Sequence, residues 1–145
     1  MLFRSGDVST DERQVIEDLR SSKSVISDTA LEKARATGSE RTIPAILDLY
    51  VAVVDGPSLG GNRRANRLDG VLRAIIERRK EAVVPILVDC CLHALDDDIR
   101  PYAASRLREM GVLGRSAIQE LEIAIQSGDE LERRRASEAL KKVRE

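Results

Sequence analysis

The second half of the chain carries two copies of one motif, 33 residues apart, in residues 98–107 and 131–140. The positions that agree are an arginine, an alanine and a leucine: Arg100 with Arg133, Ala103 with Ala136, and Leu107 with Leu140. A repeat of this length is typical of stacked helical hairpins, each too thin to bury its own apolar face. The repeat therefore predicts an all-α fold, a short α-solenoid of stacked antiparallel helical hairpins.

The composition agrees with closely packed helices. Of the 145 residues, which is a usual length for one domain, 42% are apolar and 34% are charged. Only Phe3, Tyr50 and Tyr102 are aromatic, so the core must consist mainly of Leu, Ile, Val and Ala. The same shortage removes the stacking surfaces on which proteins that bind single-stranded nucleic acid depend. Lys plus Arg (24) nearly balances Asp plus Glu (25), so the overall charge selects neither a polyanion nor a membrane.

The expected compartment is the cytoplasm. No apolar run is long enough to span a membrane, and the apolar residues 1–3 are too few for a signal peptide. Cys90 and Cys91 are adjacent and have no third cysteine to pair with, which favours a reducing environment.

Capping residues divide the chain into helices. Ser9 and Glu12 have the spacing of a capping box, Gly38 ends a helix, and Pro44 and Pro101 lie in first turns. Asp96, Asp97 and Asp98 are expected to cap a helix, and Asp129 another. One domain over residues 1–145 is thus predicted. It is expected to contain a flexible lead-in (1–8), an N-terminal capping helix (9–26), three helical hairpins (28–54, 63–95 and 97–126) and a C-terminal capping helix (129–145).

The second helices of the hairpins share a template. Ile43-Pro44-x-Ile46 returns as Val84-Pro85-x-Leu87 at a shift of 41 residues, and as Ile118-Gln119-x-Leu121 a further 34 residues on. The longer interval contains the Gly-rich stretch 55–62, which is expected to be a loop. Its glycines lack the Gly-Lys-Ser/Thr ending of a phosphate-binding loop, so a connection between hairpins is the better interpretation.

These motifs resemble those of a known family. Three stretches of this chain are similar to the HEAT-like repeats of phycobilisome-lyase type: Asp97-x-Ile99-Arg100-x-x-Ala103-Ala104-x-x-Leu107-x-x-Met110-Gly111, then Ala117-Ile118-x-x-Leu121, then Gly128-Asp129 with Arg134, Ala136 and Ala139-Leu140. Members of this family are scaffolds, adaptors, chromophore-lyase subunits and, rarely, enzymes, and the resemblance implies one of these roles. In such proteins the second helices usually line the face that holds a partner. The first hairpin departs from the pattern because it lacks the arginine expected near Ala30.

The second helices are apolar on nearly all sides, which is typical of a helix that lies centrally or faces a partner. We therefore expect a non-catalytic protein-protein interaction scaffold or adaptor whose inner groove binds an apolar segment of another protein. The candidate partner-binding residues are Asp48, Leu49, Ala52, Val53, Ile86, Asp89, Cys90 and His93. The chain itself is expected to be a monomer or a weak homodimer.

Two alternatives to this function remain. Residues 61–80 carry an excess of basic side chains that nucleic acid would select, although a solvated helix paired with acids such as residues 96–98 explains them too. These residues are Arg63, Arg64, Arg67, Arg73, Arg78, Arg79 and Lys80. The other alternative, by analogy with the family alone, is a lyase-like or chaperone-like subunit that acts with a partner.

Catalysis and metal binding have little support from the sequence. Cys90 and His93, with Asp89, supply at most three ligands, whereas structural zinc usually takes four. With one histidine no Ser-His-acid set is evident, and helix capping explains the acids at 96–98 more simply than acid/base chemistry does. We therefore expect no cofactor, no metal and no enzymatic activity.

Overall fold

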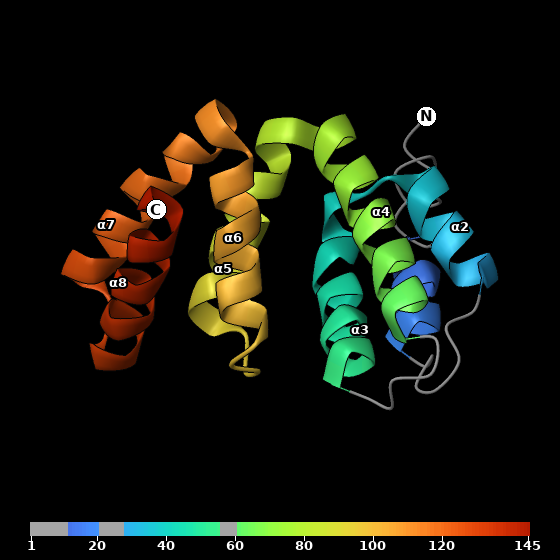
Figure 1. The fold of residues 1–145 in the computed structure, drawn as a ribbon. Coiled ribbons are helices and arrows are strands. Elements are labelled where there is room, and N and C mark those ends of the chain that lie inside the picture. Colours follow the sequence, from blue (N-terminus) through green and yellow to red (C-terminus); the bar gives the residue numbers. More distant parts are fainter. Residues whose placement is uncertain (1–11, 21–27, 56–60) are drawn as a thin grey trace. The chain divides into compact units, whose positions relative to one another are not determined.

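The computed structural model describes residues 12–20, 28–55 and 61–145 (Figure 1). Throughout these ranges the regular structure is helical, without a strand, which confirms the all-α prediction. The chain divides into two compact units, Met1–Arg79 and Lys80–Glu145. The boundary falls within the predicted hairpin 63–95, and the expectation of one continuous domain stays a prediction. No helix of the described ranges is both long enough and apolar enough to cross a bilayer.

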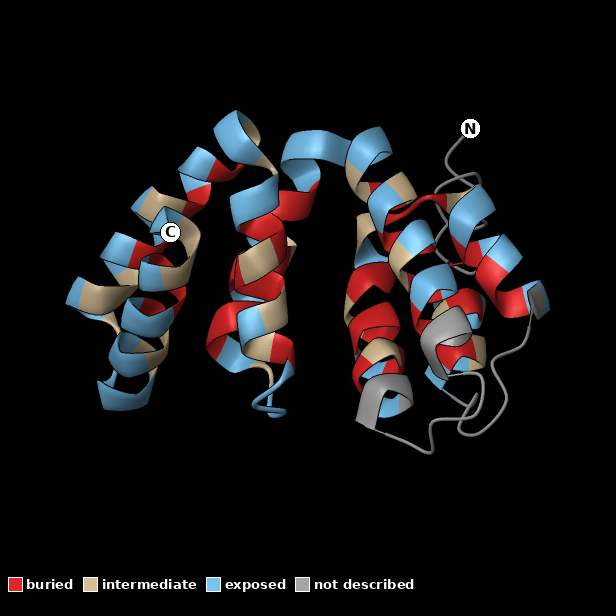
Figure 2. Cartoon of the chain, viewed as in Figure 1, coloured by how far each residue is buried: buried red, intermediate tan, exposed pale blue. Residues whose placement is uncertain are grey.

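The first unit, called unit 1, consists of helix 12–20 and the elements α2 (Asp28–Thr37), η1 (Glu40–Thr42), α3 (Ile43–Asp55) and α4 (Gly61–Arg79). Both α2 and α3 pack against α4. Leucine and isoleucine side chains fill the space between these helices, and those of Leu47, Leu68 and Ile75 are completely buried. The aliphatic core that the composition predicted is present, and Figure 2 shows buried residues along α2, α3 and α4.

The end of α2 lies where the sequence places it. Gly38 has φ of +59°, a left-handed conformation that favours glycine, and its N–H donates to the Ala34 carbonyl at 2.9 Å. A Cβ at this position would lie 2.8 Å from Nη1 of Arg78, so the site leaves no room for a side chain. The predicted glycine stop of this helix is confirmed.

Helix 12–20 is joined to the turn after α2 by a buried hydrogen bond. Ser39 Oγ donates to Oε1 of Glu12 at 2.6 Å, and both residues are more than nine-tenths buried. Arg41 Nη1 lies 3.9 Å from the other oxygen of this carboxylate. The predicted capping box cannot be seen in this contact, because Ser9 lies outside the described residues, as do the lead-in 1–8 and the loop residues 56–60.

The second unit, called unit 2, contains η2 (Lys80–Ala82), α5 (Val83–His93), α6 (Ile99–Glu109), η3 (Gly111–Gly114), α7 (Arg115–Ser127) and α8 (Glu130–Arg144). Here α5 packs on α6, while α8 packs on both α6 and α7. Ala103 and Ala136, the alanines of the repeated motif, are completely buried. Their small side chains suit the packing of α6 and α8 against each other, as the repeat predicts.

The caps of unit 2 agree with the sequence in one place and differ in another. Asp129 caps α8, because its Oδ1 accepts from the Glu132 N–H at 2.8 Å. Asp98 precedes α6 but its side chain makes no capping hydrogen bond. Instead Asp96 Oδ1 accepts from the Asp98 N–H at 2.8 Å, and Asp97 pairs with Arg100. The expectation that these three acids cap α6 is therefore wrong, because their residues form a turn before the helix begins.

Candidate functional site

The partner-binding residues predicted on α3 divide between surface and core. Asp48 and Ala52 are exposed, whereas Leu49 is only 6% exposed. The side chain of Val53 lies outside the described residues. On this helix the surface open to a partner is narrower than the sequence indicated.

The residues predicted on α5 divide in the same way. Asp89 and His93 are exposed and Ile86 is half-buried, but Cys90 is 6% exposed. His93 Nε2 lies 3.9 Å from Asp89 Oδ1, one turn away. The expectation that Leu49 and Cys90 offer apolar area to a partner is wrong, because consecutive residues of a helix point about 100° apart and both of these turn inward.

The second helices nevertheless all expose one position of their shared template. Asp48, Asp89 and Ile123 occupy equivalent positions on α3, α5 and α7, and all three are exposed. Ile123 is 57% exposed, and Leu95, Val112 and Leu131 are the other large apolar residues that are exposed among the described residues. The positions one turn before and after complete a line of side chains on each helix: Pro44 and Ala52 on α3, Pro85 and His93 on α5, and Gln119 and Ser127 on α7. We call these lines the second-helix stripe.

The two cysteines are buried and unreactive in character. Both are free thiols within the core of unit 2. Burial, with a smaller contribution from Cys90, raises the pKa of Cys91 from an ordinary 9.0 to about 12. Because the thiolate is the nucleophile and the metal ligand, this environment suppresses both kinds of chemistry. Among the described residues no three of the side chains His, Cys, Asp and Glu gather in a possible metal site.

The basic segment of the sequence has a structural use. Arg78 Nη1 donates to the Ala36 carbonyl at 3.2 Å, and Arg79 Nε donates to the Gly38 carbonyl at 2.7 Å. These are carbonyls at the end of α2, where a helix lacks internal donors and cations are favoured. Arg79 Nε also lies 3.7 Å from Glu40 Oε2.

The other cations of this segment that the structure describes have different surroundings. Arg73 pairs with Asp69 on its own helix at 2.9 Å, Arg67 is exposed, and Lys80 belongs to unit 2. The side chains of Arg63 and Arg64 lie outside the described residues. The expected pairing with the acids at 96–98 is not what occupies Arg78 and Arg79, which bind the end of α2 instead.

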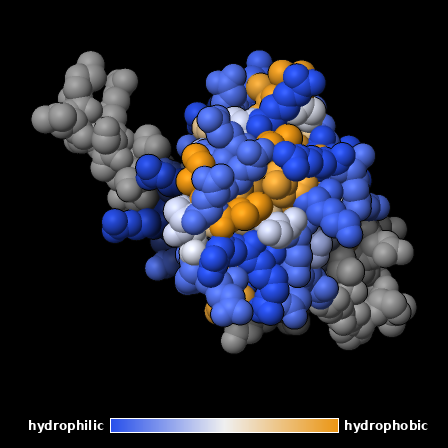
Figure 3. Space-filling model, turned by 90° about the vertical axis from the view of Figure 1, so that its left-hand side faces the viewer, coloured by the Kyte–Doolittle hydropathy of each residue, from blue (hydrophilic) through white to orange (hydrophobic). Residues whose placement is uncertain are grey.

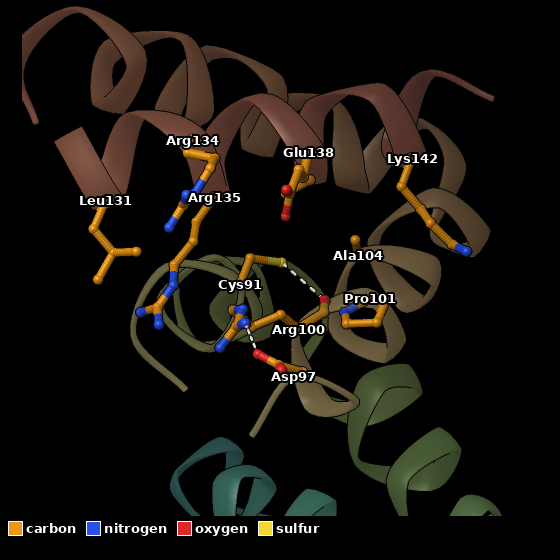
Figure 4. A pocket seen from close by; sticks show the side chains of 11 residues that line it. Cys91, Asp97, Arg100, Pro101, Ala104, Leu131, Arg134, Arg135, Glu138 and Lys142 are labelled. Atoms are coloured by element: carbon orange, nitrogen blue, oxygen red, sulfur yellow. Dashed lines mark hydrogen bonds and ion pairs between the residues drawn. The ribbon is translucent and has the colours of Figure 1, made fainter. Parts of the chain in front are cut away.

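Unit 2 contains a pocket that sequence reasoning missed. It has a volume of about 520 Å³ and lies between α6 and α8, with Cys91 of α5 also in its lining. Figure 4 shows Arg134, Arg135 and Glu138 reaching from α8 toward α5 and α6, with Leu131 and Lys142 at opposite ends of the row.

Hydrogen bonds hold two of the arginines in this pocket. Arg100 Nη1 donates to the Ala94 carbonyl at 2.7 Å, and Arg100 Nη2 pairs with Asp97 (Figure 4). Arg135 Nη1 donates to the Leu92 carbonyl at 2.9 Å. Both arginines therefore bind the C-terminal end of α5 while they line the pocket. The 33-residue repeat was the signal that could have revealed this pocket, because it places α6 and α8 as neighbours.

Comparison with protein-family models, curated proteins and solved structures gave no significant match. The likeness to HEAT-like repeats thus rests on the motifs of the sequence.

Proposed function

We propose that the chain is a non-catalytic protein-binding scaffold or adaptor, built as a short HEAT-like α-solenoid with an N-terminal capping helix and acting in the cytoplasm. The observation that carries this proposal is the second-helix stripe: Asp89 on α5 and Ile123 on α7 are exposed at equivalent positions within unit 2, and Asp48 is exposed at the same template position of α3 in unit 1. Repeat proteins use equivalent positions of successive repeats to build an extended binding surface.

In unit 2 the stripe combines apolar and charged contacts. The neighbouring helices α5 and α7 present Asp89 and Ile123 at equivalent positions. Exposed Ile123 supplies apolar area that a partner can bury, while the Asp89 carboxylate sets orientation and the rate of association. Figure 3 shows the side of α7 and α8, where apolar surface lies between hydrophilic side chains.

A nucleic-acid interface on α4 is the weaker candidate. The donors of Arg78 and Arg79 already bind the α2 carbonyls, and Arg73 is paired with Asp69. A nucleic acid would have to displace these contacts before its phosphates could bind the three arginines.

Affinity capture from the source cells tests the proposal with two matched pairs of variants. Asp89→Lys and Ile123→Arg change the stripe and are expected to remove the specific partner. Glu120→Lys and Val112→Arg make the same changes at exposed positions outside the stripe and should retain it. The same set of captured proteins with all four variants would contradict the proposal. Leu49→Asp does not serve as a test, because this side chain is core and its loss would unfold unit 1.

A further inference from the structure

The pocket between α6 and α8 is long enough for a segment of another chain. Its wall on α8 runs from Leu131 to Lys142, which spans about 16 Å at the rise of an α-helix. An extended peptide of about five residues has this length. A single small anion would fill only part of the row.

The charges that line the pocket favour an acidic occupant. Four cations and two carboxylates contribute to the lining, and the Asp97 carboxylate is already neutralised by Arg100. The side chains of Arg134 and Lys142 make no hydrogen bond or ion pair with any part of the chain that the structure describes. Their donors are therefore available to a ligand without loss of an internal contact.

The order of these charges distinguishes a peptide from a nucleic acid. Glu138 lies between Arg134 and Lys142, at four-residue intervals along one face of α8. Evenly spaced phosphates would place a negative charge against this carboxylate, and the lining contains no aromatic side chain on which a base could stack. A peptide can place an apolar residue there and keep its acids for the two ends.

The remaining lining is apolar. Ala104 and Ala139 form a closely packed wall, and Leu131 is 42% exposed at one end. An apolar side chain flanked by acids would find complementary surface along the whole row.

We propose that this pocket binds a short acidic segment of a partner protein, with carboxylates at Arg134 and Lys142 and an apolar residue between them. The inference rests on the proposed protein-binding function and names the chemistry of one contact. Binding of this kind weakens as salt screens the charges.

The test is fluorescence anisotropy with the purified chain and a short fluorescein-labelled peptide that is rich in Glu and has a central Leu. A second peptide has every Glu replaced by Gln. The acidic peptide is expected to bind, and Arg134→Glu or Lys142→Glu to weaken its binding by about tenfold or more. Arg133→Glu and Lys141→Glu are matched controls, because they change the same charge at exposed neighbouring positions outside the pocket. These two should bind within about twofold of the parent chain, as expected for charges at the rim.

Several results would overturn the inference. These are no binding of the acidic peptide, equal binding of the Gln peptide, and equal losses in the pocket variants and their controls. Full competition by inorganic phosphate at millimolar concentration, or by a single-stranded oligonucleotide with the same dependence on Arg134, would assign the pocket to another ligand and reject the peptide. Circular dichroism checks that each variant is folded.

The outcome is separable from that of the proposed function. If the stripe variants lose a captured partner while the Arg134 and Lys142 variants keep it and no acidic peptide binds, only the pocket inference fails. If no stripe-dependent partner exists, the proposed binding through the stripe fails, whether or not the acidic peptide binds to the pocket.

Discussion

Helices α4 and α8 are both rich in basic residues, yet the structure uses their cations differently. At the end of α4, Arg78 and Arg79 donate to the carbonyls that terminate α2. On α8, Arg134 and Lys142 have no partner within the described residues and line a pocket. The density of charge along a sequence therefore does not show where free charge lies. The internal acceptors that each cation can reach decide whether it serves folding or binding.

The largest expected effect tests the binding of α4 to the end of α2. Gly38→Ala forces a side chain into a left-handed conformation and against Arg78, so it should lower the free energy of unfolding by about 2 kcal/mol. Urea unfolding of the variant measures this change. Gly70→Ala is the control, because Gly70 lies within α4 with no atom near its Cβ position. It should stabilise the protein by up to about 1 kcal/mol, and equal effects of the two changes would contradict the role given to Gly38.

Removing one of the capping guanidiniums should have the next largest effect. Arg79→Ala removes a donor from the Gly38 carbonyl and a charge near Glu40, which should cost about 1.5 kcal/mol of stability in urea unfolding. The comparison is Arg73→Ala, which removes only an exposed pair on one helix and should cost about 0.3 kcal/mol. Equal costs would mean that the capping contacts contribute no more than a surface pair.

The pKa of Cys91, which lines the α6–α8 pocket, reports how well water is excluded from this thiol. Its pKa of about 12 in the folded chain exceeds the ordinary 9.0 of an unfolded thiol, so the unfolded state loses its proton first. Stability should be complete below pH 9 and decline as the pH rises from 9 to 12. Between about pH 8 and 10 the thiol should account for a loss of about 1.4 kcal/mol.

Urea unfolding at about pH 8 and about pH 10, measured for the parent chain and for Cys91→Ala, isolates the contribution of the thiol to the loss of stability. The variant should show a smaller decline, because other titrating groups affect both chains. Identical declines would show that water reaches the thiol.

The smallest expected effect belongs to the unpaired arginine. Arg134→Ala should change stability by less than about 0.5 kcal/mol, because it removes no internal hydrogen bond. Its neighbour Arg135 donates to the Leu92 carbonyl, so Arg135→Ala should cost about 1 kcal/mol. Thermal unfolding of the two variants compares them directly. A large loss with Arg134→Ala would show that this side chain serves the fold.

Local signals in the sequence predicted much of the fold. Gly38 and Asp129 mark helix ends because their backbone and capping requirements depend on near neighbours. The repeat predicted the burial of Ala103 and Ala136, since periodicity reports which face of a helix is covered.

The site was predicted less well, because it depends on contacts between distant residues. Leu49 and Cys90 lie on helices that are apolar nearly all round, and in such helices composition does not separate core from surface. Arg78 donates to the Ala36 carbonyl, which lies 42 residues away in the sequence, and no local pattern indicates such a contact. Three consecutive arginines occupy residues 133–135, yet only Arg134 and Arg135 line the pocket.

The buried bond between Glu12 and Ser39 has a consequence for shortening the protein. A chain trimmed to begin at residue 28 would lose the Glu12 carboxylate that accepts from Ser39 Oγ, together with the buried apolar side chains of Val15 and Leu19. Unit 1 expressed from residue 28 should therefore aggregate, and the stretch ahead of α2 has to be retained in any minimal fragment.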